Sequence, residues 1–240
     1  MQIGIKMQVK RFPIATTFLV VLNIVVFTVG MLSGSQTQII QNYGFIPNHL
    51  FSANTGQGTE TNNLDNSIRH DLMPSSPLQQ SNQGSSPPLS YSLVTLFTSM
   101  FIHSNIAHIA FNLLALVYLG GYAERAIGIP RYLLVYFMAG IAAALFHGVI
   151  ASHILNNGDV VLIGASGAIS GVLGIAAVSG NTRAYYWLVF QIVFAVVGSV
   201  SAIPIAFTAH VGGFIAGALI TKGLVKLEQI RTKSRYFLQP

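Results

Sequence analysis

Four polar side chains lie in strongly apolar stretches, at spacings that could support acyl-transfer chemistry. Ser166 lies in GASGAISG, His210 in TAHVGGFIAG, and His108 and Asn112 in HSNIAHIAFN. Peptide hydrolysis by acyl transfer requires a serine, a base that takes its proton, and hydrogen-bond donors for the developing oxyanion. Imidazole can perform both proton transfers near neutral pH. His108 and Asn112 are four residues apart and therefore share one face of a helix, from which both can donate.

The composition places these residues in a membrane. Hydrophobic residues make up 52% of the 240-residue chain and charged residues 8%, with a mean hydropathy of +0.61, whereas a soluble domain carries roughly a quarter charged residues. A helix needs roughly 20 apolar residues to cross a bilayer. The apolar runs do not alternate with period two, which argues against a barrel. We predict an all-α membrane protein with a six-helix bundle, its helices near residues 12–32, 105–122, 131–152, 164–180, 184–203 and 208–226.

The basic residues predict the orientation of this bundle. With a cytoplasmic N-terminus, all Lys and Arg residues except Arg69 fall on the cytoplasmic side, which is a strong positive-inside signal. Both termini are then cytoplasmic. These basic residues at the helix ends account for the net charge of +6. Their expected partner is the anionic lipid of the cytoplasmic leaflet, and no nucleic-acid partner is expected. The cytoplasmic residues are Lys6, Lys10, Arg11, Arg125, Arg131, Arg183, Lys222, Lys226, Arg231, Lys233 and Arg235.

A polar stretch interrupts the long external connection between the first two helices. Residues 52–90 are rich in Ser, Asn, Gln, Gly and Pro, and such a segment buries too little apolar surface to offset the entropy of ordering. We expect a flexible insertion there, within a single membrane domain over residues 1–240. The flanking stretches NYGFIPNHLF and YSLVTLFTSMFI are apolar but too short or interrupted to span, so we expect them to lie in the membrane interface.

The second, fourth and sixth predicted helices run in the same direction, so their first turns lie at similar depth. Those turns carry the polar residues, and ionisable side chains inside a membrane usually face the bundle interior or an aqueous cavity. Faces of small residues would let the fourth and sixth helices approach closely. These faces consist of Ser166, Gly167, Ser170, Gly171 and Gly174 on the fourth helix, and Ala209, Gly213 and Gly217 on the sixth.

A purely structural role is the alternative for each polar residue. A serine in a glycine-rich membrane helix usually serves packing. His147 and His153 stand apart from the other candidates and are interpreted as interfacial or hydrogen-bonded to a neighbour. His103 lies near the outer surface, where a structural and a functional role are both open. The common depth of Ser166 and His210 favours a site over packing alone.

Three short motifs follow one another along the predicted helices: HIAFN, GASGAISG and AHVGGFIAG. They resemble the H-x-x-x-N, G-x-S-G-x-x-x-G and A-H-x-x-G-x-x-x-G motifs of the rhomboid family of intramembrane serine proteases, and the resemblance extends over essentially the whole membrane region. It implies that Ser166 is the nucleophile and His210 the general base. It further implies an oxyanion site formed by His108, Asn112 and the Ser166 backbone N–H. The glycines that match these motifs are Gly164, Gly167, Gly171, Gly213 and Gly217.

A catalytic carboxylate is not evident. Only Asp159 falls near the outer mouth, and it would reach His210 only if its loop folded inward. We therefore predict a Ser–His dyad, as the resemblance also implies, with no cofactor and no metal. The chain has no cysteine, so a thiolate site is excluded. The acids are Glu60, Asp65, Asp71, Glu124, Asp159 and Glu228, in loops or at cytoplasmic ends.

The chain departs from the family pattern at three places. YSLVT at residues 91–95 stands where many members have Trp-Arg, Ile205 replaces a frequent glycine, and Ser170 replaces a tyrosine that stacks on the histidine. None of these changes removes a catalytic group. What orients the His210 ring in the absence of that tyrosine is left open.

Together these features predict a serine endopeptidase that cleaves transmembrane segments of membrane-protein substrates. Residues 164–180 make only about 25 Å of helix, so we expect Ser166 to lie below the outer surface, in a cavity open to external water. Substrate would arrive sideways and unwind locally, aided by helix-breaking residues. We expect a multi-pass protein of the plasma membrane. The alternatives are a rhomboid-like protein that binds transmembrane clients without cleaving them and a small transporter, although no inverted repeat is visible. The oligomeric state is open.

Overall fold

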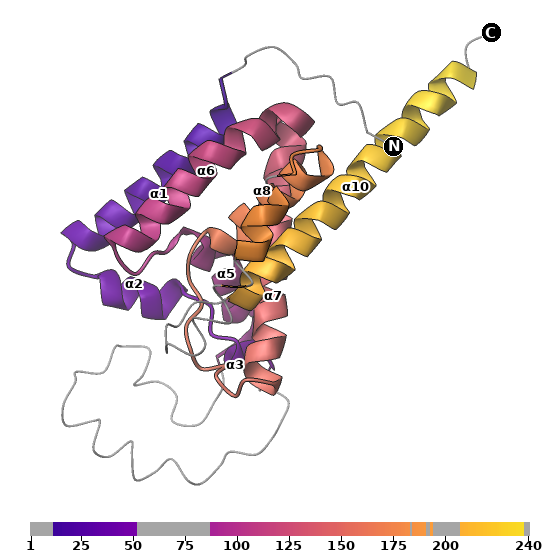
Figure 1. Cartoon of the computed structure of the whole chain (residues 1–240). Helices are drawn as coiled ribbons and strands as arrows, with labels where there is room; N and C mark the ends of the chain where they lie inside the picture. Colours follow the sequence, from indigo (N-terminus) through magenta and orange to yellow (C-terminus); the bar gives the residue numbers. More distant parts are fainter. Residues whose placement is uncertain (1–11, 52–86, 183, 191–192, 194–206, 238–240) are drawn as a thin grey trace, which may run out of the picture.

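The computed structural model describes residues 12–51, 87–182, 184–190, 193 and 207–237 (Figure 1). The predicted insertion at residues 52–90 lies outside the described residues except for its last four, and Leu89 and Ser90 of these already belong to a helix. The described residues form helices and one isolated β-bridge. The helices are α1 (Ile14–Leu32), α2 (Gln36–Tyr43), α3 (Asn48–Phe51), α5 (Leu89–Thr98), the 3-10 helix η2 (Ser99–Phe101), α6 (Ile106–Ile127), α7 (Ile129–His153), α8 (Ser166–Val178) and α10 (Phe207–Phe237).

The chain is an all-helical membrane protein. Among the described residues, α1, α6, α7 and the Phe207–Arg231 part of α10 are long and apolar enough to cross a bilayer. The predicted fourth helix, α8, is apolar but has only 13 residues, or about 20 Å of helix. Most of the predicted fifth helix lies outside the described residues, although residues 184–190 are helical.

The helix boundaries differ from the predicted ones mainly at the C-terminal ends of α6 and α10. α6 continues to Ile127 and ends at Gly128, whose φ of +83° suits a residue without Cβ. α10 continues to Phe237 because its polar stretch consists largely of good helix formers such as Lys, Leu, Glu and Arg. Its C-terminal part consequently projects beyond the other helices (Figure 1).

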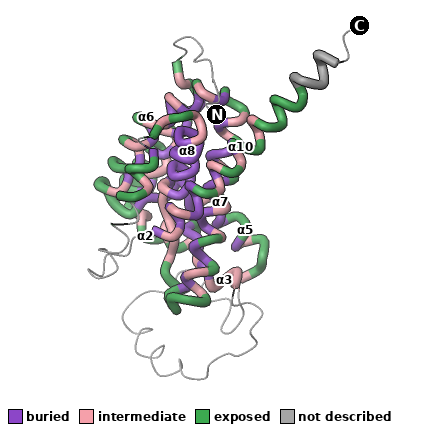
Figure 2. Tube along the Cα trace, turned by 45° about the vertical axis from the view of Figure 1, so that its right-hand side comes forward, coloured by how far each residue is buried: buried purple, intermediate pink, exposed green. Residues whose placement is uncertain are grey.

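α8 is the central helix of the bundle. Every residue from Gly167 to Ala177 is buried, and in the tube view the purple of buried residues runs along α8 between α6, α7 and α10 (Figure 2). A helix that is apolar on all sides is expected at the interior of a bundle. α6, α7 and α10 therefore surround α8, and its first residue, Ser166, emerges at one end of the core.

Glycines bring α8 and α10 almost into backbone contact. A Cβ on Gly213 would meet the carbonyl oxygen of Gly167, and a Cβ on Gly217 would meet that of Gly171. One turn further, a Cβ on Gly174 would lie 2.5 Å from the backbone nitrogen of Ala218. In a membrane, where lipid tails are as apolar as side chains, such close approach supplies the van der Waals contact that holds helices together.

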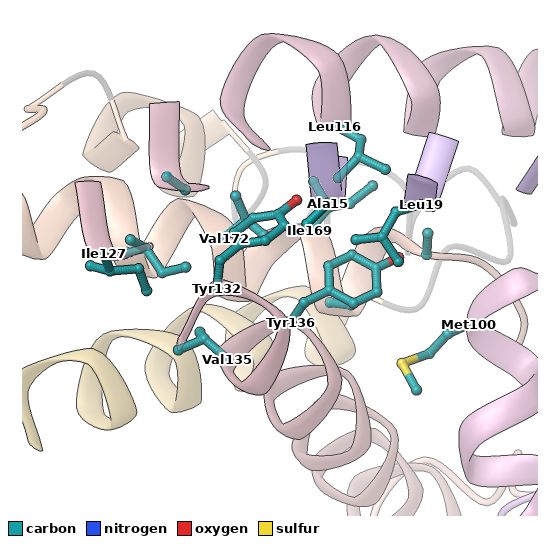
Figure 3. Close-up of a cluster of buried hydrophobic side chains, with 14 of the residues drawn as sticks. Ala15, Leu19, Met100, Leu116, Ile127, Tyr132, Val135, Tyr136, Ile169 and Val172 are labelled. Atoms are coloured by element: carbon teal, nitrogen blue, oxygen red, sulfur yellow. The ribbon is translucent and has the colours of Figure 1, made fainter. Parts of the chain in front are cut away.

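A second contact region joins α1, α6 and α7. The buried cluster there includes Leu19, Leu116, Tyr132 and Tyr136, with the two tyrosine rings reaching from α7 toward α1 and α6 (Figure 3). The buried carboxyl group of Glu124 accepts hydrogen bonds from the backbone N–H groups of Ala15 (3.2 Å) and Thr16 (2.8 Å) and from the Thr16 hydroxyl (2.8 Å). Glu124 thus satisfies orphan donors at the start of α1.

The short helices α2, α3 and α5 pack beside the bundle on the side of the α8 N-terminus. The Tyr91 hydroxyl donates to the carbonyl of Asn42 at 2.9 Å, and the Thr98 hydroxyl donates to that of Tyr43 at 2.7 Å. Phe45 and Leu162 pair as an antiparallel bridge through hydrogen bonds of 3.0 and 2.7 Å. This bridge attaches the segment that leads into α8 to the segment that follows α2.

The contact between α8 and α10 yields a paired test. We expect Gly217→Ala to lower the free energy of unfolding by about 1–3 kcal/mol, because the added methyl overpacks against Gly171. Gly223→Ala is the matched control on the same helix, since nothing lies within 4 Å of that Cβ, and we expect it to be neutral or stabilising by up to about 1 kcal/mol. Thermal unfolding in detergent micelles measures both. Equal effects of the two substitutions would contradict the packing described.

Candidate active site

Ser166 is the first residue of α8 and follows a sharp corner at Gly164. The φ of Gly164 is +112°, a conformation that side-chain-bearing residues rarely adopt. The Gly164 N–H donates to the Ser99 carbonyl at 2.9 Å, and together with the Phe45–Leu162 bridge this bond fixes the approach to α8. The backbone N–H groups of the first turn have no intrahelical acceptor and lie at the positive end of the helix dipole. The Ser166 N–H is therefore suited to stabilise an anion.

His210 lies in the first turn of α10, with only 8% of its surface exposed. The same turn contacts the first turn of α8, since a Cβ on Gly167 would lie 3.9 Å from the Ala209 carbonyl oxygen. Ser166 directly precedes Gly167 and His210 directly follows Ala209. The structure thus brings the turns that carry the predicted nucleophile and base against each other.

His108 faces the Gly164 corner with its Nε2 atom. A Cβ on Gly164 would lie 2.6 Å from Nε2 of His108 and 3.8 Å from Oγ of Ser166. The backbone N–H of Ser104 donates to Nδ1 of His108 at 3.5 Å, and the Ser104 hydroxyl lies 3.2 Å from the same atom. Because an N–H can only donate, Nδ1 is the acceptor in the Ser104 contact, which favours the neutral tautomer with its proton on Nε2. A donor therefore points at the space beside Ser166.

Asn112 lies one turn after His108 on α6 and is 6% exposed. Its amide nitrogen donates to the His108 carbonyl at 2.9 Å, which holds the side chain against its own helix. An amide nitrogen has two hydrogens. The second N–H is left to donate on the face that Asn112 shares with His108.

His103 lies in the loop before α6 and is 1% exposed. Its ring stands edge-on to that of His108, with 5.0 Å between ring centroids. Burial, with a smaller effect of the neighbouring His108, lowers the pKa of His103, so the ring stays neutral near neutral pH. The His103 ring thus packs against the ring of the candidate donor His108.

Asp159 and His153 lie apart from this cluster, whereas His147, which was predicted to stand apart, contacts the first turn of α10 close to His210. Asp159 accepts a hydrogen bond from the Asn48 amide at 2.9 Å in an exposed position. His153 packs edge-on against Phe51, and His147 Nδ1 lies 2.6 Å from the Thr208 hydroxyl. Among the described residues, no three His, Asp or Glu side chains gather as metal ligands would.

Comparison with known proteins identifies the family. Residues 90–227, more than half of the chain, match the sequence profile of the rhomboid domain, and the chain belongs to the rhomboid family. It is 32% identical over 149 residues to Rhomboid protease AarA of Providencia stuartii, which covers 51% of this chain and 53% of that protein. It is 46% identical over 79 residues to Rhomboid protease GluP of Bacillus subtilis, covering 33% of this chain and 14% of that protein.

The relatives differ in what their names say of activity. Inactive RHOMBOID-like protein 8 of Arabidopsis thaliana is 28% identical over 126 residues, covering 52% of this chain and 31% of that protein. The chain spans about half the length of the first relative and less of the other two. At the level of the family, the similarity supports an intramembrane protease.

Three contacts near the site were not predicted from the sequence. They are the pairing of Ser104 with His108, the ring contact of Phe207 with His210, and the contact of Thr208 with His147, and each involves at least one residue outside the family motifs. The i, i+4 spacing of Ser104 and His108 and the i, i+3 spacing of Phe207 and His210 are the only signals that could have suggested two of them.

The corner at Gly164 gives a test of how His108 is held. Gly164→Ala and Gly180→Ala both force alanine into a positive φ, which costs roughly 1–2 kcal/mol in each case. Only the Gly164 methyl meets His108, because nothing lies within 4 Å of a Cβ on Gly180. We expect both variants to lose thermal stability, Gly164→Ala the more, and a shift of the His108 imidazole resonances, in ¹⁵N-histidine-labelled protein, only for Gly164→Ala. Unchanged His108 resonances in that variant would contradict the placement of Nε2.

Proposed function

We propose that the protein is an intramembrane serine endopeptidase that cleaves transmembrane segments with a Ser166–His210 dyad. The observation that carries this proposal is the Gly164 corner, where the space beside Ser166 Oγ also adjoins Nε2 of His108. The contact between the first turns of α8 and α10 supports it further. These features supply a nucleophile, a nearby base and an oxyanion donor within one region.

Acylation begins when Ser166 Oγ attacks the carbonyl carbon of the scissile peptide bond and its proton passes to the His210 imidazole. The oxyanion that forms accepts hydrogen bonds from the Nε2–H of His108, the second amide N–H of Asn112 and the Ser166 backbone N–H. The carbon–nitrogen bond then breaks, and the leaving amine takes the proton from His210. Each such donor contributes about 10²–10³-fold to kcat.

Deacylation repeats these steps with water. His210 takes a proton from water as its oxygen attacks the acyl carbon, and returns that proton to Ser166 Oγ when the ester bond breaks. The carboxyl product leaves and the free serine is restored. The chemistry balances with one water consumed for each peptide bond cleaved and requires neither metal nor cofactor.

The length of α8 supports cleavage below the membrane surface. Its 13 residues make about 20 Å of helix, against a hydrocarbon core of about 30 Å. Ser166 thus begins a helix that stops short of the outer boundary, and water reaches it from the external side. A substrate helix must unwind to expose its backbone there, so glycine or proline near the cleavage site favours cleavage.

We further propose six membrane helices with both termini in the cytoplasm. The first turns of α6, α8 and α10 then lie on the external side, an orientation that the distribution of basic residues supports. We place the protein in the plasma membrane, with transmembrane proteins as its substrates. The insertion at residues 52–90 belongs to the external loop of this single membrane domain.

The dyad is tested with purified protein reconstituted with a single-span substrate that carries glycine or proline in its outer half. We expect cleavage by wild type and a loss of at least about 10³-fold in both Ser166→Ala and His210→Ala. Equal cleavage by all three proteins would reveal a contaminating protease. No cleavage by wild type, across several substrates that nevertheless bind, would favour a client-binding rhomboid protein instead.

A catalytic triad is tested separately at Asp159. Its carboxylate is exposed and bonded to Asn48, so we expect Asp159→Asn to keep kcat/KM within about twofold of wild type, as for most surface substitutions. Asn48→Ala, which removes the hydrogen-bond donor to Asp159, should likewise keep kcat/KM within about twofold of wild type. A loss in Asp159→Asn as large as in His210→Ala would replace the dyad with a triad.

A further inference from the structure

The His210 ring needs a support that Ser170 does not provide. Ser170 stands one turn after Ser166, facing the core, and its hydroxyl donates to the Ser166 carbonyl at 2.9 Å. It is therefore committed to its own helix and is too small to cover an imidazole. A base that must pass a proton between two positions loses efficiency when its ring can rotate away from either.

Phe207 contacts the His210 ring from the same helix. The two ring centroids are 5.8 Å apart with planes at 85°, an edge-to-face geometry that is favourable for aromatic pairs. Phe207 precedes His210 by three residues, so the two side chains are neighbours on the α10 surface. Both are 8% exposed, which makes this a packed contact within the fold.

The rotation of the α10 first turn is fixed from α7. His147 Nδ1 lies 2.6 Å from the Thr208 hydroxyl, and a Cβ on Gly212 would lie 2.7 Å from Cβ of Phe146. Thr208 and Gly212 are four residues apart and form one face of α10. Adjacent residues of α7 thus hold α10 at two points of that face.

The helical geometry then determines where His210 can point. At about 100° per residue, the face of Ala209 and Gly213, which meets α8, lies about 100° from the face that meets α7. His210 lies about 80° beyond the α8 face, and Phe207 about 60° beyond His210. The imidazole is consequently bounded by α8 on one side and by the Phe207 ring on the other.

We propose that Phe207 and the His147–Thr208 hydrogen bond are the positioning elements that hold the His210 imidazole toward Ser166. Phe207 blocks rotation of the ring away from α8, and His147 fixes the helix face from which the ring projects. These residues do not touch the reacting atoms. The inference rests on the proposed function in so far as His210 is the base, while the orientation of its ring is measurable without activity.

The experiment compares Phe207→Leu with Phe207→Tyr, and Thr208→Val with Thr208→Ser. Phe207→Tyr, which keeps the aromatic ring, and Thr208→Ser, which keeps the hydroxyl, are the controls. With the reconstituted single-span substrate, we expect Phe207→Leu and Thr208→Val to lower kcat by about tenfold, a factor typical of a misplaced catalytic group, with KM unchanged. The controls should stay within about twofold of wild type.

The second readout is the imidazole spectrum of His210 in ¹⁵N-histidine-labelled protein, assigned with His210→Ala. Phe207→Leu should shift the ring resonances by removing a neighbouring ring current, and Thr208→Val should broaden or shift them, whereas the controls should not. Unchanged His210 resonances in both test variants would overturn the proposal, whether or not wild type cleaves. Shifted His210 resonances in the test variants, together with no protease activity in wild type, would support the positioning role and refute the proposed function. Should Phe207→Leu not fold, the Thr208 pair decides.

Discussion

The near-contact of the α8 and α10 backbones is the constraint on which the rest of the structure depends. Gly213 and Gly217 meet the carbonyl oxygens of Gly167 and Gly171 at a distance that leaves no room for side chains. Without water in the bilayer to drive apolar surfaces together, this proximity must supply much of the attraction between the two helices. It also fixes their axial register, so the first turns of both helices end at one level. The chemistry of the site is thus a consequence of packing, since a slip of one residue would turn His210 by about 100°.

Opposite this contact, a polar interaction organises the other half of the bundle. Glu124 of α6 binds the first backbone N–H groups of α1, while Tyr132 and Tyr136 fill the space between α1, α6 and α7 (Figure 3). α6 therefore has two tasks: its last turns anchor α1, and its first turn carries His108 and Asn112. Because α6 is one continuous helix, the contacts of Glu124 at its end help to fix the position of His108 and Asn112 at its start.

Much of this architecture could be predicted from local patterns, and what could not depends on tertiary contacts. Long apolar runs locate α1, α6, α7 and α10, and small residues at three- and four-residue spacing predict which helix faces meet. The motif residues could be found because their types are rare inside membranes. The predicted end of α10 at residue 226 was too early, because the hydropathy of the sequence falls there while its helix propensity stays high up to Phe237. The acceptor role of His108 Nδ1 depends on Ser104, and the aromatic support of His210 depends on Phe207. Serine and phenylalanine are common residue types, so these contacts become visible only when the side-chain conformations are known.

The complete burial of α8 bears on how the protein is made. A helix of 13 residues is too short to be retained alone as a membrane span, and its small, apolar surface is satisfied only when α6, α7 and α10 surround it. α10 begins well after α8 ends in the chain, so during synthesis α8 leaves the ribosome before its closest partner exists. Ser166 then lacks the helix that carries His210. The proposed Ser166–His210 site can therefore form only after the last described helix, α10, has inserted.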